Sequence, residues 1–132
     1  MKLLYLSSVI FFLLIPGAVL ADALDNVANL IKQGSNKEIG KLFAPTVEMT
    51  VMADEQSYPQ TQATSMLGDF FAKHKPQTIK LLHKVNSSAT IQLGVYILTT
   101  ADKQEYRIAF TLKDVGGTMR IIEFGIEDEK VK

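Results

Sequence analysis

Residues 60–76, QTQATSMLGDFFAKHKP, carry the strongest helical pattern in the chain. Apolar residues recur in this stretch at the three- and four-residue spacing that places side chains on one face of an α-helix: Ala63, Met66, Leu67, Phe70 and Phe71. Pro76 blocks continuation because proline has no backbone N–H to donate. We therefore predict a long helix over residues 60–75, with both phenylalanines pointing at the main core.

The residues after this helix are predicted to form β-strands. Four stretches rich in β-branched and aromatic residues are separated by turn signals, and they cover residues 78–85, 90–100, 104–113 and 118–127. Connections this short can join only antiparallel neighbours, so the four strands form a meander. Because helices come first and the sheet follows, the fold class is α+β rather than alternating α/β.

Two further helices are predicted before the long one. Residues 22–33 place Leu24, Val27, Ala28 and Ile31 on one helical face, and Gly34 is a natural stop. Ser35 and Glu38 have the spacing of a capping box, which opens a second, short helix that Pro45 ends.

Between the short and the long helix, alternation predicts a half-buried strand. Val47, Met49 and Val51 alternate with more polar residues. Asp54 and Glu55 mark a turn, and residues 57–58 form a short return strand before the long helix.

Residues 1–21 are predicted to be an export signal. Lys2 supplies a positive start, residues 3–15 are apolar apart from two serines, and small residues precede a cleavage site after Ala21. The apolar stretch is short for a membrane span, although an uncleaved anchor is the alternative. The mature part, residues 22–132, is expected to be a single α+β domain in the periplasm or outside the cell, and it contains no further span.

Composition excludes several classes of function. The formal net charge is 0, and it becomes −1 once Lys2 is removed, which argues against a general nucleic-acid binder. The absence of cysteine excludes disulfides, a lipidated cysteine and thiol chemistry. Two histidines nine residues apart form no metal-ligand spacing, so we expect no metal and no cofactor. Glycoside hydrolysis needs two facing carboxylates, and the sequence alone does not pair any of Glu48, Asp54, Asp69 and Glu123.

The predicted order of elements resembles the nuclear transport factor 2-like (cystatin-like, SnoaL-like) superfamily. More closely, the chain resembles a family of short exported bacterial proteins of unknown function. The resemblance lies in residues 41–43 (KLF), 47–50 (VEMT), 67–71 (LGDFF), 82–84 (LHK) and 121–127 (IIEFGIE). It implies a curved sheet wrapped around the long helix as a cone with a pocket at its open end. The superfamily contains isomerases, dehydratases, epoxide hydrolases and binding modules, so the fold alone does not choose the function.

His83 is the candidate catalytic or ligand-binding residue. Strict alternation places it on one face with Ile79, Leu81 and Val85, and a polar ring on an apolar face needs a partner or a cavity. If that face is the cone interior, His83 is a pocket base. The alternatives are a structural histidine with its hydrogen bonds satisfied, or an edge position displaced outward by a bulge.

Three other residues are candidates for ligand binding. Arg120 alternates with Ile122 and Phe124, so it extends to solvent or reaches the pocket mouth. Tyr106 heads an apolar stripe, and Tyr58 lies before the long helix. Packing or surface placement is the alternative for each. Residues 70–101 contain four lysines and no acid, which indicates either a solvated face or attraction of an anionic partner.

These observations lead to three functional hypotheses. The first is a non-catalytic module of the cell envelope that binds a small hydrophobic molecule or a protein partner. The second is a small isomerase or lyase that uses His83 in an apolar pocket. A homodimer built on the outer sheet face, with Tyr96 and Leu98 at the contact, is compatible with either. A core filled by its own side chains would favour a protein partner.

Overall fold

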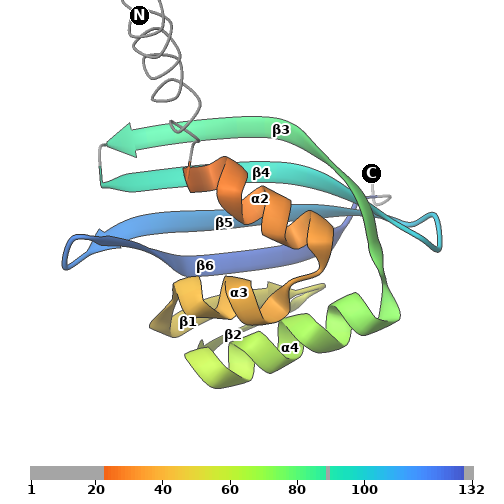
Figure 1. The fold of residues 1–132 in the computed structure, drawn as a ribbon, viewed down its shortest axis with the longest axis horizontal. Helices are drawn as coiled ribbons and strands as arrows, with labels where there is room; N and C mark the ends of the chain where they lie inside the picture. The colour runs from red at the N-terminus through yellow and green to blue at the C-terminus, as the bar shows by residue number, and fades with distance from the viewer. Residues whose placement is uncertain (1–22, 89, 130–132) are drawn as a thin grey trace, which may run out of the picture.

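The structure is a computed structural model, and it describes residues 23–88 and 90–129. The predicted export signal, residues 1–21, lies outside this part. Within the described ranges, helices and strands follow in the predicted order (Figure 1). The helices are α2 (Ala23–Gln33), α3 (Asn36–Leu42) and α4 (Gln60–Lys73). The strands are β1 (Phe43–Val51), β2 (Asp54–Pro59), β3 (Pro76–Ser88), β4 (Ile91–Thr100), β5 (Glu105–Val115) and β6 (Thr118–Asp128).

The strands form one sheet in the order β2-β1-β6-β5-β4-β3. Strands β3 to β6 pair antiparallel in sequence, which confirms the predicted meander. Strand β1 joins β6 in parallel, and β2 returns antiparallel along β1. The result is a mixed, curved and open sheet, so the predicted α+β class is confirmed. Strands β2 and β3 are its two edges.

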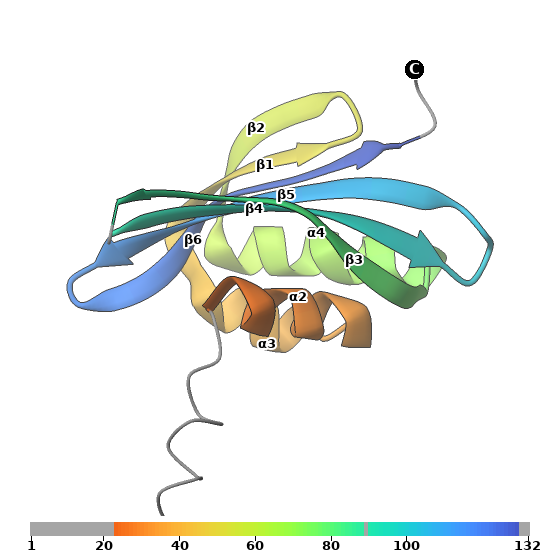
Figure 2. The same ribbon diagram turned by 90° about the horizontal axis from the view of Figure 1, so that it is seen from above.

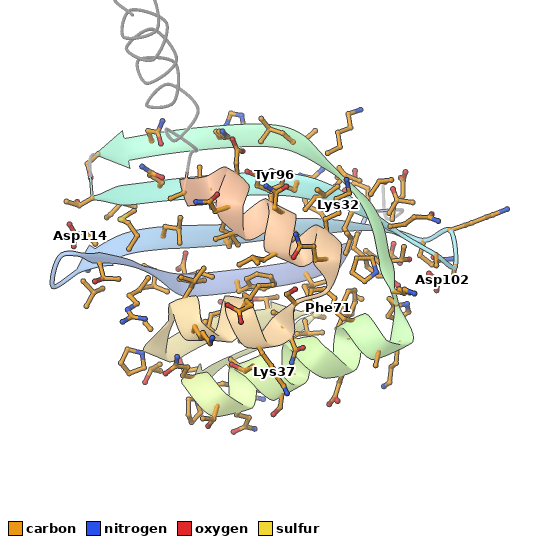
Figure 3. All side chains as sticks on the ribbon, viewed as in Figure 1. Lys32, Lys37, Phe71, Tyr96, Asp102 and Asp114 are labelled. Atoms are coloured by element: carbon orange, nitrogen blue, oxygen red, sulfur yellow. The ribbon has the colours of Figure 1, made fainter. Side chains whose placement is uncertain are left out.

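All three helices cover one face of the sheet, which we call the inner face; the opposite face is the outer face (Figure 2). Phe71 and Tyr96 point into the layer between helices and sheet (Figure 3). Four aromatic rings follow one another across this layer, with centroid separations of 5.6 Å, 6.1 Å and 6.0 Å: Tyr96, Phe110, Phe124 and Phe43. Each buried side chain of this size contributes about 1.5–3 kcal/mol. Side chains of the protein itself therefore fill this layer.

The helical faces agree with the sequence pattern. Leu24, Val27, Ala28 and Ile31 of α2 are buried. On α4 the buried residues are Ala63, Leu67, Phe70 and Phe71, whereas Met66 is half-buried at the margin of the core. Apolar periodicity thus identified the contact face of both helices.

Both ends of α3 differ from the prediction. Ser35 precedes α3 but makes no side-chain cap hydrogen bond, and Glu38 pairs with Lys41 at 3.2 Å instead. The predicted capping box is therefore wrong. Pro45 lies inside β1 and does not end the helix, because the backbone is already extended at Phe43, which pairs with Ile121 of β6.

The turn after β1 also lies two residues earlier than expected. Residues 52–53 make it, with Met52 at φ 61° and its N–H donating to the carbonyl of Ile126 at 2.7 Å. Asp54 and Glu55 belong to β2, which is longer than the predicted return strand. The pairing of β1 with β6 places this turn.

A β-bulge in β3 changes which face its side chains occupy. Leu81 opposes Tyr96 of β4, but His83 opposes Val95, so Leu82 is an extra residue on β3. Opposing residues of antiparallel strands share a face, and one extra residue moves every later side chain to the other face. His83 therefore lies exposed on the outer face. Its predicted position on the inner face is wrong, and the alternative of a bulge that displaces it outward is confirmed.

On strand β4, the two residues that were predicted to form a dimer contact on the outer face lie on the inner face instead. Tyr96 and Leu98 are 2% and 0% exposed and belong to the core. A Cβ on Gly94 would lie 2.8 Å from the Tyr96 ring, so the glycine makes room for that ring. Alternation cannot tell which of two apolar sets faces the helices. The outer face of β4 bears Leu93, Val95 and Ile97 instead.

Candidate functional site

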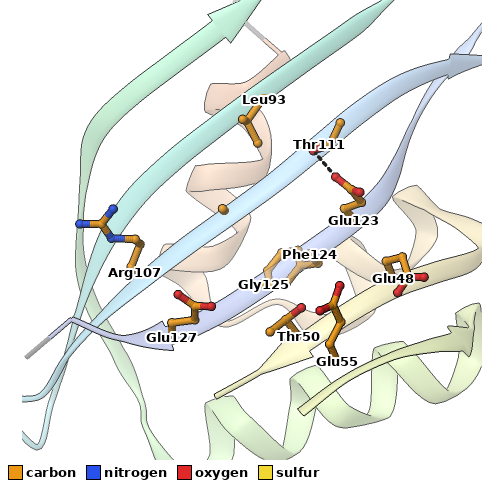
Figure 4. Close-up of a pocket in the computed structure, with 11 residues that line it drawn as sticks. Glu48, Thr50, Glu55, Leu93, Arg107, Thr111, Glu123, Phe124, Gly125 and Glu127 are labelled. Carbon is orange, nitrogen blue, oxygen red and sulfur yellow. Dashed lines mark hydrogen bonds between the residues drawn. The ribbon is translucent and has the colours of Figure 1, made fainter. Parts of the chain in front are cut away.

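A trough of about 280 Å³ lies on the outer face of the sheet (Figure 4). Residues from β1, β2, β4, β5 and β6 line it. Gly125 of β6 lies near its centre, and Leu93 and Ala109 add apolar surface. Four glutamates surround the centre: Glu48, Glu55, Glu123 and Glu127.

Two of these carboxylates are brought together by the parallel strand pair. Glu48 of β1 and Glu123 of β6 occupy the same register, and neighbouring strands lie about 4.8 Å apart. Ser57 donates a hydrogen bond to Glu48 at 2.8 Å, and Thr111 donates one to Glu123 at 2.9 Å. These hydroxyls orient the carboxylates without neutralising them. Like charges side by side repel, so a bound cation would relieve the repulsion.

Arg107 is the basic residue among those that line the trough, and its charge is already matched. Its Nε and Nη2 donate to the two carboxylate oxygens of Glu129, at 2.9 Å and 3.4 Å. The hydrogen bond and the charge of Glu129 raise the pKa of Arg107 above its already high ordinary value. The trough therefore presents a surplus of negative charge.

A second hollow, of about 390 Å³, lies between α3 and the start of α4 and is more open to solvent. Lys37 and Lys41 stand at its margin. Gln60 donates to the carbonyl of Gly40 at 2.7 Å, and the Thr64 hydroxyl donates to the carbonyl of Gln60 at 2.8 Å. The first of these bonds joins α4 to α3, and the second lies within α4.

A polar cluster at the end of α4 contains the histidine that sequence reasoning passed over. His74 Nδ1 lies 3.2 Å from Asp102 Oδ2 and 3.1 Å from Tyr106 Oη. An ionised carboxylate only accepts hydrogen bonds, so in this contact His74 Nδ1 carries the proton and donates the hydrogen bond to Asp102. The Phe70 ring lies 5.0 Å from the rings of both His74 and Tyr106. The cluster joins the end of α4 to the turn between β4 and β5.

The protonation of this cluster follows from its hydrogen bonds. The Thr100 hydroxyl donates to Asp102 and is the main reason that the pKa of Asp102 lies below its ordinary value, with a further contribution from His74. Burial raises the pKa of Tyr106, and the negative charges of Asp102 and Asp128 raise it further. Tyr106 therefore stays a neutral phenol that contacts the imidazole.

The structure places the four predicted site residues far from one another. Tyr106 lies on the inner face, 5% exposed, beside His74 rather than His83. Tyr58 opposes Val47 on the inner face, just before the start of α4, whereas Tyr106 lies at its end. A helix of this length spans about 20 Å, so the two tyrosines do not meet.

Arg120 serves the packing of α3. Its Nη1 donates to the backbone carbonyl of Lys41 at 2.7 Å. Carbonyls in the last turn of a helix have no intrahelical partner, and a guanidinium satisfies one of them. With His83 on the outer face, the four predicted residues do not assemble one site.

Within residues 23–88 and 90–129, no group of three or more His, Asp or Glu side chains is arranged to hold a metal ion. No helix in these ranges has both the length and the apolar character that a membrane crossing requires.

The model of one protein family, described as a domain of unknown function (DUF4783), matches residues 24–127. A solved structure of a DUF4783 family protein from Bacteroides uniformis aligns with a TM-score of 0.76 at 18% identity, covering 83% of this chain and 99% of that one. Among curated proteins, no sequence matches significantly.

Two other solved structures show how widely the fold is shared. An NTF-2 like protein of unknown function from Silicibacter pomeroyi aligns with a TM-score of 0.60 at 12% identity, covering 81% of this chain and 93% of that one. A putative calcium/calmodulin dependent protein kinase II association domain from Xanthomonas campestris aligns with a TM-score of 0.56 at 15% identity, covering 83% and 84%. At these identities the likeness shows the fold alone.

Proposed function

The chain belongs to the DUF4783 family of domains of unknown function, and from the geometry of its outer face we propose that it is an exported, non-catalytic module that binds a protein partner. The acidic trough receives a cationic side chain, arginine or lysine, of that partner. Export rests on the signal pattern of residues 1–21. The trough between Glu48 and Glu123 is the observation that carries the binding role.

The size of the trough favours a side chain over a whole small molecule. Pockets for drug-sized ligands have volumes of roughly 300–1,000 Å³, and this trough has about 280 Å³. A guanidinium presents a planar set of donors that matches a carboxylate in two hydrogen bonds. Neighbouring Glu48 and Glu123 offer two such acceptors, which favours arginine.

The packing of the inner face supports a protein partner rather than a small hydrophobic ligand. Aromatic and aliphatic side chains occupy the layer between helices and sheet, so an apolar molecule would have to displace them. The Xanthomonas campestris protein that shares this fold is described as a putative calcium/calmodulin dependent protein kinase II association domain, and a shared fold is compatible with an association role here. The alternative of a small isomerase or lyase receives no support from the exposed position of His83.

Peptide binding tests the proposal. A fluorescent peptide of alternating glycine and arginine is titrated with the purified chain by anisotropy, alongside a peptide with glutamate in place of arginine. We expect the arginine peptide to bind in a salt-sensitive manner. The double variant Glu48→Gln/Glu123→Gln should bind it about tenfold more weakly, which corresponds to about 1.4 kcal/mol.

The matched control is Glu38→Gln/Asp69→Asn, which removes two exposed carboxylates from the helical side. This variant should retain the affinity of the unmodified chain, because neither residue lines the trough. Equal binding of the acidic and basic peptides, or equal losses in both double variants, would overturn the proposed site.

A further inference from the structure

The two edge strands of the sheet carry opposite charges. Strand β2 contains Asp54 and Glu55 and no basic residue. Strand β3 contains no acid and two lysines; Lys84 already pairs with Asp25 of α2 at 3.2 Å, so Lys80 supplies the charge of this edge. Strands β2 and β3 end the sheet on its two sides. An edge strand leaves a row of backbone N–H and C=O groups without a sheet partner, so each edge can accept a further strand.

From this complementarity we infer that the chain associates with copies of itself edge to edge, the β2 edge of one copy pairing with the β3 edge of the next. The inference concerns the two strand edges and does not depend on the proposed partner; Glu55 belongs both to the β2 edge and to the rim of the trough, whereas Lys80 does not line the trough. It commits to a second copy because both complementary edges belong to the same molecule.

The side chains match face by face as well as in total charge. On the outer face, Glu55 opposes Thr50 and Lys80 opposes Ile97, so a sheet continued from one copy to the next keeps both charges on that face. In the described part of the chain, neither the Glu55 side chain nor the Lys80 side chain has a hydrogen-bond or ion-pair partner. Each is available to the other edge.

The inner face adds an apolar contact. Leu81 opposes Tyr96 on the inner face of β3, and it is 47% exposed. Tyr58 lies on the inner face of β2 and is half-buried. In a continued sheet these two side chains belong to the same layer and can cover each other.

Charge argues against the symmetric pairing of two β3 strands. That arrangement brings Lys80 of both copies onto one seam, and like charges on paired strands are destabilising. The register shifts on either side of residues 78–81 also interrupt a long straight pairing. A contact between two different edges is heterologous, so it continues into a ring or a filament rather than stopping at a dimer.

Sedimentation of the purified chain over a range of concentrations tests the inference. At low salt the weight-average mass should rise with concentration beyond that of a dimer. In about 1 M salt, where the Debye length is ~3 Å, association should weaken. The single variants Lys80→Glu and Glu55→Lys should each associate roughly fivefold more weakly, because an attractive pair becomes a repulsive one.

Mixing the two variants gives the sharpest readout. Lys80→Glu has a glutamate at both positions 55 and 80, and Glu55→Lys has a lysine at both, so an equal mixture should regain association, as should the double variant. Lys37→Glu and Asp69→Lys, which reverse charges on the helices, serve as controls and should behave like the unmodified chain. A chain that stays monomeric at all concentrations, or a dimer that neither charge reversal changes, would overturn the inference; the latter result would indicate a contact through the sheet face.

Discussion

The inner and outer faces of the same sheet are built for different purposes. On the inner face, Phe110 and Phe124 are almost fully buried and their rings stack with centroids 6.1 Å apart. On the outer face of the same two strands, Arg107 and Glu127 are exposed and line an open trough. Successive side chains of one strand alternate between these faces. A single strand can therefore supply stability and recognition at once.

This difference indicates where substitutions should affect stability and where they should affect binding. Inner-face contacts exclude water and cannot be removed without leaving a cavity. Outer-face carboxylates remain hydrated, so their removal costs little stability but changes the charge that a partner meets. The following predictions are arranged from the largest expected effect to the smallest.

The largest contrast is between Phe124→Ala on the inner face and Ile97→Ala on the outer face. Phe124 is 1% exposed and contacts the rings of Phe43 and Phe110, so its truncation should lower the free energy of unfolding by about 3–5 kcal/mol. Ile97 is half-buried on the outer face, and its truncation should lower it by no more than about 1 kcal/mol. Urea titration measures both free energies of unfolding, provided that the slope of free energy against urea concentration is the same in both variants. Equal losses would contradict the distinction between the faces.

Two glycines sharpen the comparison. A Cβ at Gly40 would lie 2.2 Å from Thr64 Oγ1 where α3 meets α4, so Gly40→Ala should lower the free energy of unfolding by roughly 1–3 kcal/mol. A Cβ at Gly125 would come no closer than 3.7 Å to any atom, so Gly125→Ala should change stability by less than about 0.5 kcal/mol.

The second readout for these glycines is binding. The added methyl group of Gly125→Ala enters the trough and should weaken binding of the arginine peptide, whereas Gly40→Ala should leave this binding unchanged. Thr64→Ala introduced together with Gly40→Ala should recover part of the lost stability, since it removes the two closest atoms. No recovery in this double-mutant cycle would place the cause elsewhere.

The two histidines provide a smaller contrast. His74→Ala removes the partner of the buried Tyr106 hydroxyl and a ring that packs on Phe70, so it should lower the free energy of unfolding by about 1–2 kcal/mol. His83→Ala acts on an exposed outer-face residue and should change it by less than about 0.5 kcal/mol. Thermal unfolding of both variants compares them, and a larger loss for His83→Ala would contradict the placement made by the bulge.

The smallest effect is the dependence of stability on acid pH. The pKa of Asp102 is lowered from its ordinary value of 3.8, chiefly by the Thr100 hydroxyl. As the pH falls, the Asp102 carboxylate is therefore protonated first in the unfolded chain. The stabilisation that Asp102 gives is fully present above pH 3.8, and it is lost as the pH falls through the lower pKa of the folded chain. Below about pH 4, Asp102→Asn and Thr100→Val should each lose stability less steeply than the unmodified chain. Parallel pH profiles from urea titrations would show that the pair has no such role.

Local patterns predicted most of the secondary structure. The apolar spacing of residues 60–76 identified α4 and its buried face, and turn signals separated the four strands of the meander. These features depend on neighbours within a few positions of the chain, and the sequence records such neighbours directly. The stop predicted at Pro45 is wrong because the chain is already extended at Phe43, which pairs with Ile121 of β6, far away in the sequence. The capping box at Ser35 is also wrong, and Glu38 pairs with Lys41 instead.

The candidate site could not be predicted in the same way. The pairing of Glu48 with Glu123 needs the parallel contact of β1 with β6, and the meeting of His74 with Asp102 needs the end of α4 to lie on the turn between β4 and β5. A single weak signal existed for His74, its place just after the two buried phenylalanines of α4.

The sequence by itself determined the order and type of the elements and the buried faces of α2 and α4, because residues three or four positions apart in a helix share a face whatever surrounds them. Only the tertiary structure decided the outward position of His83, since the extra residue at Leu82 appears only when β3 is paired with β4. It also decided that the inner layer is filled and that the acidic trough opens on the outer face, because both result from contacts between residues distant in sequence.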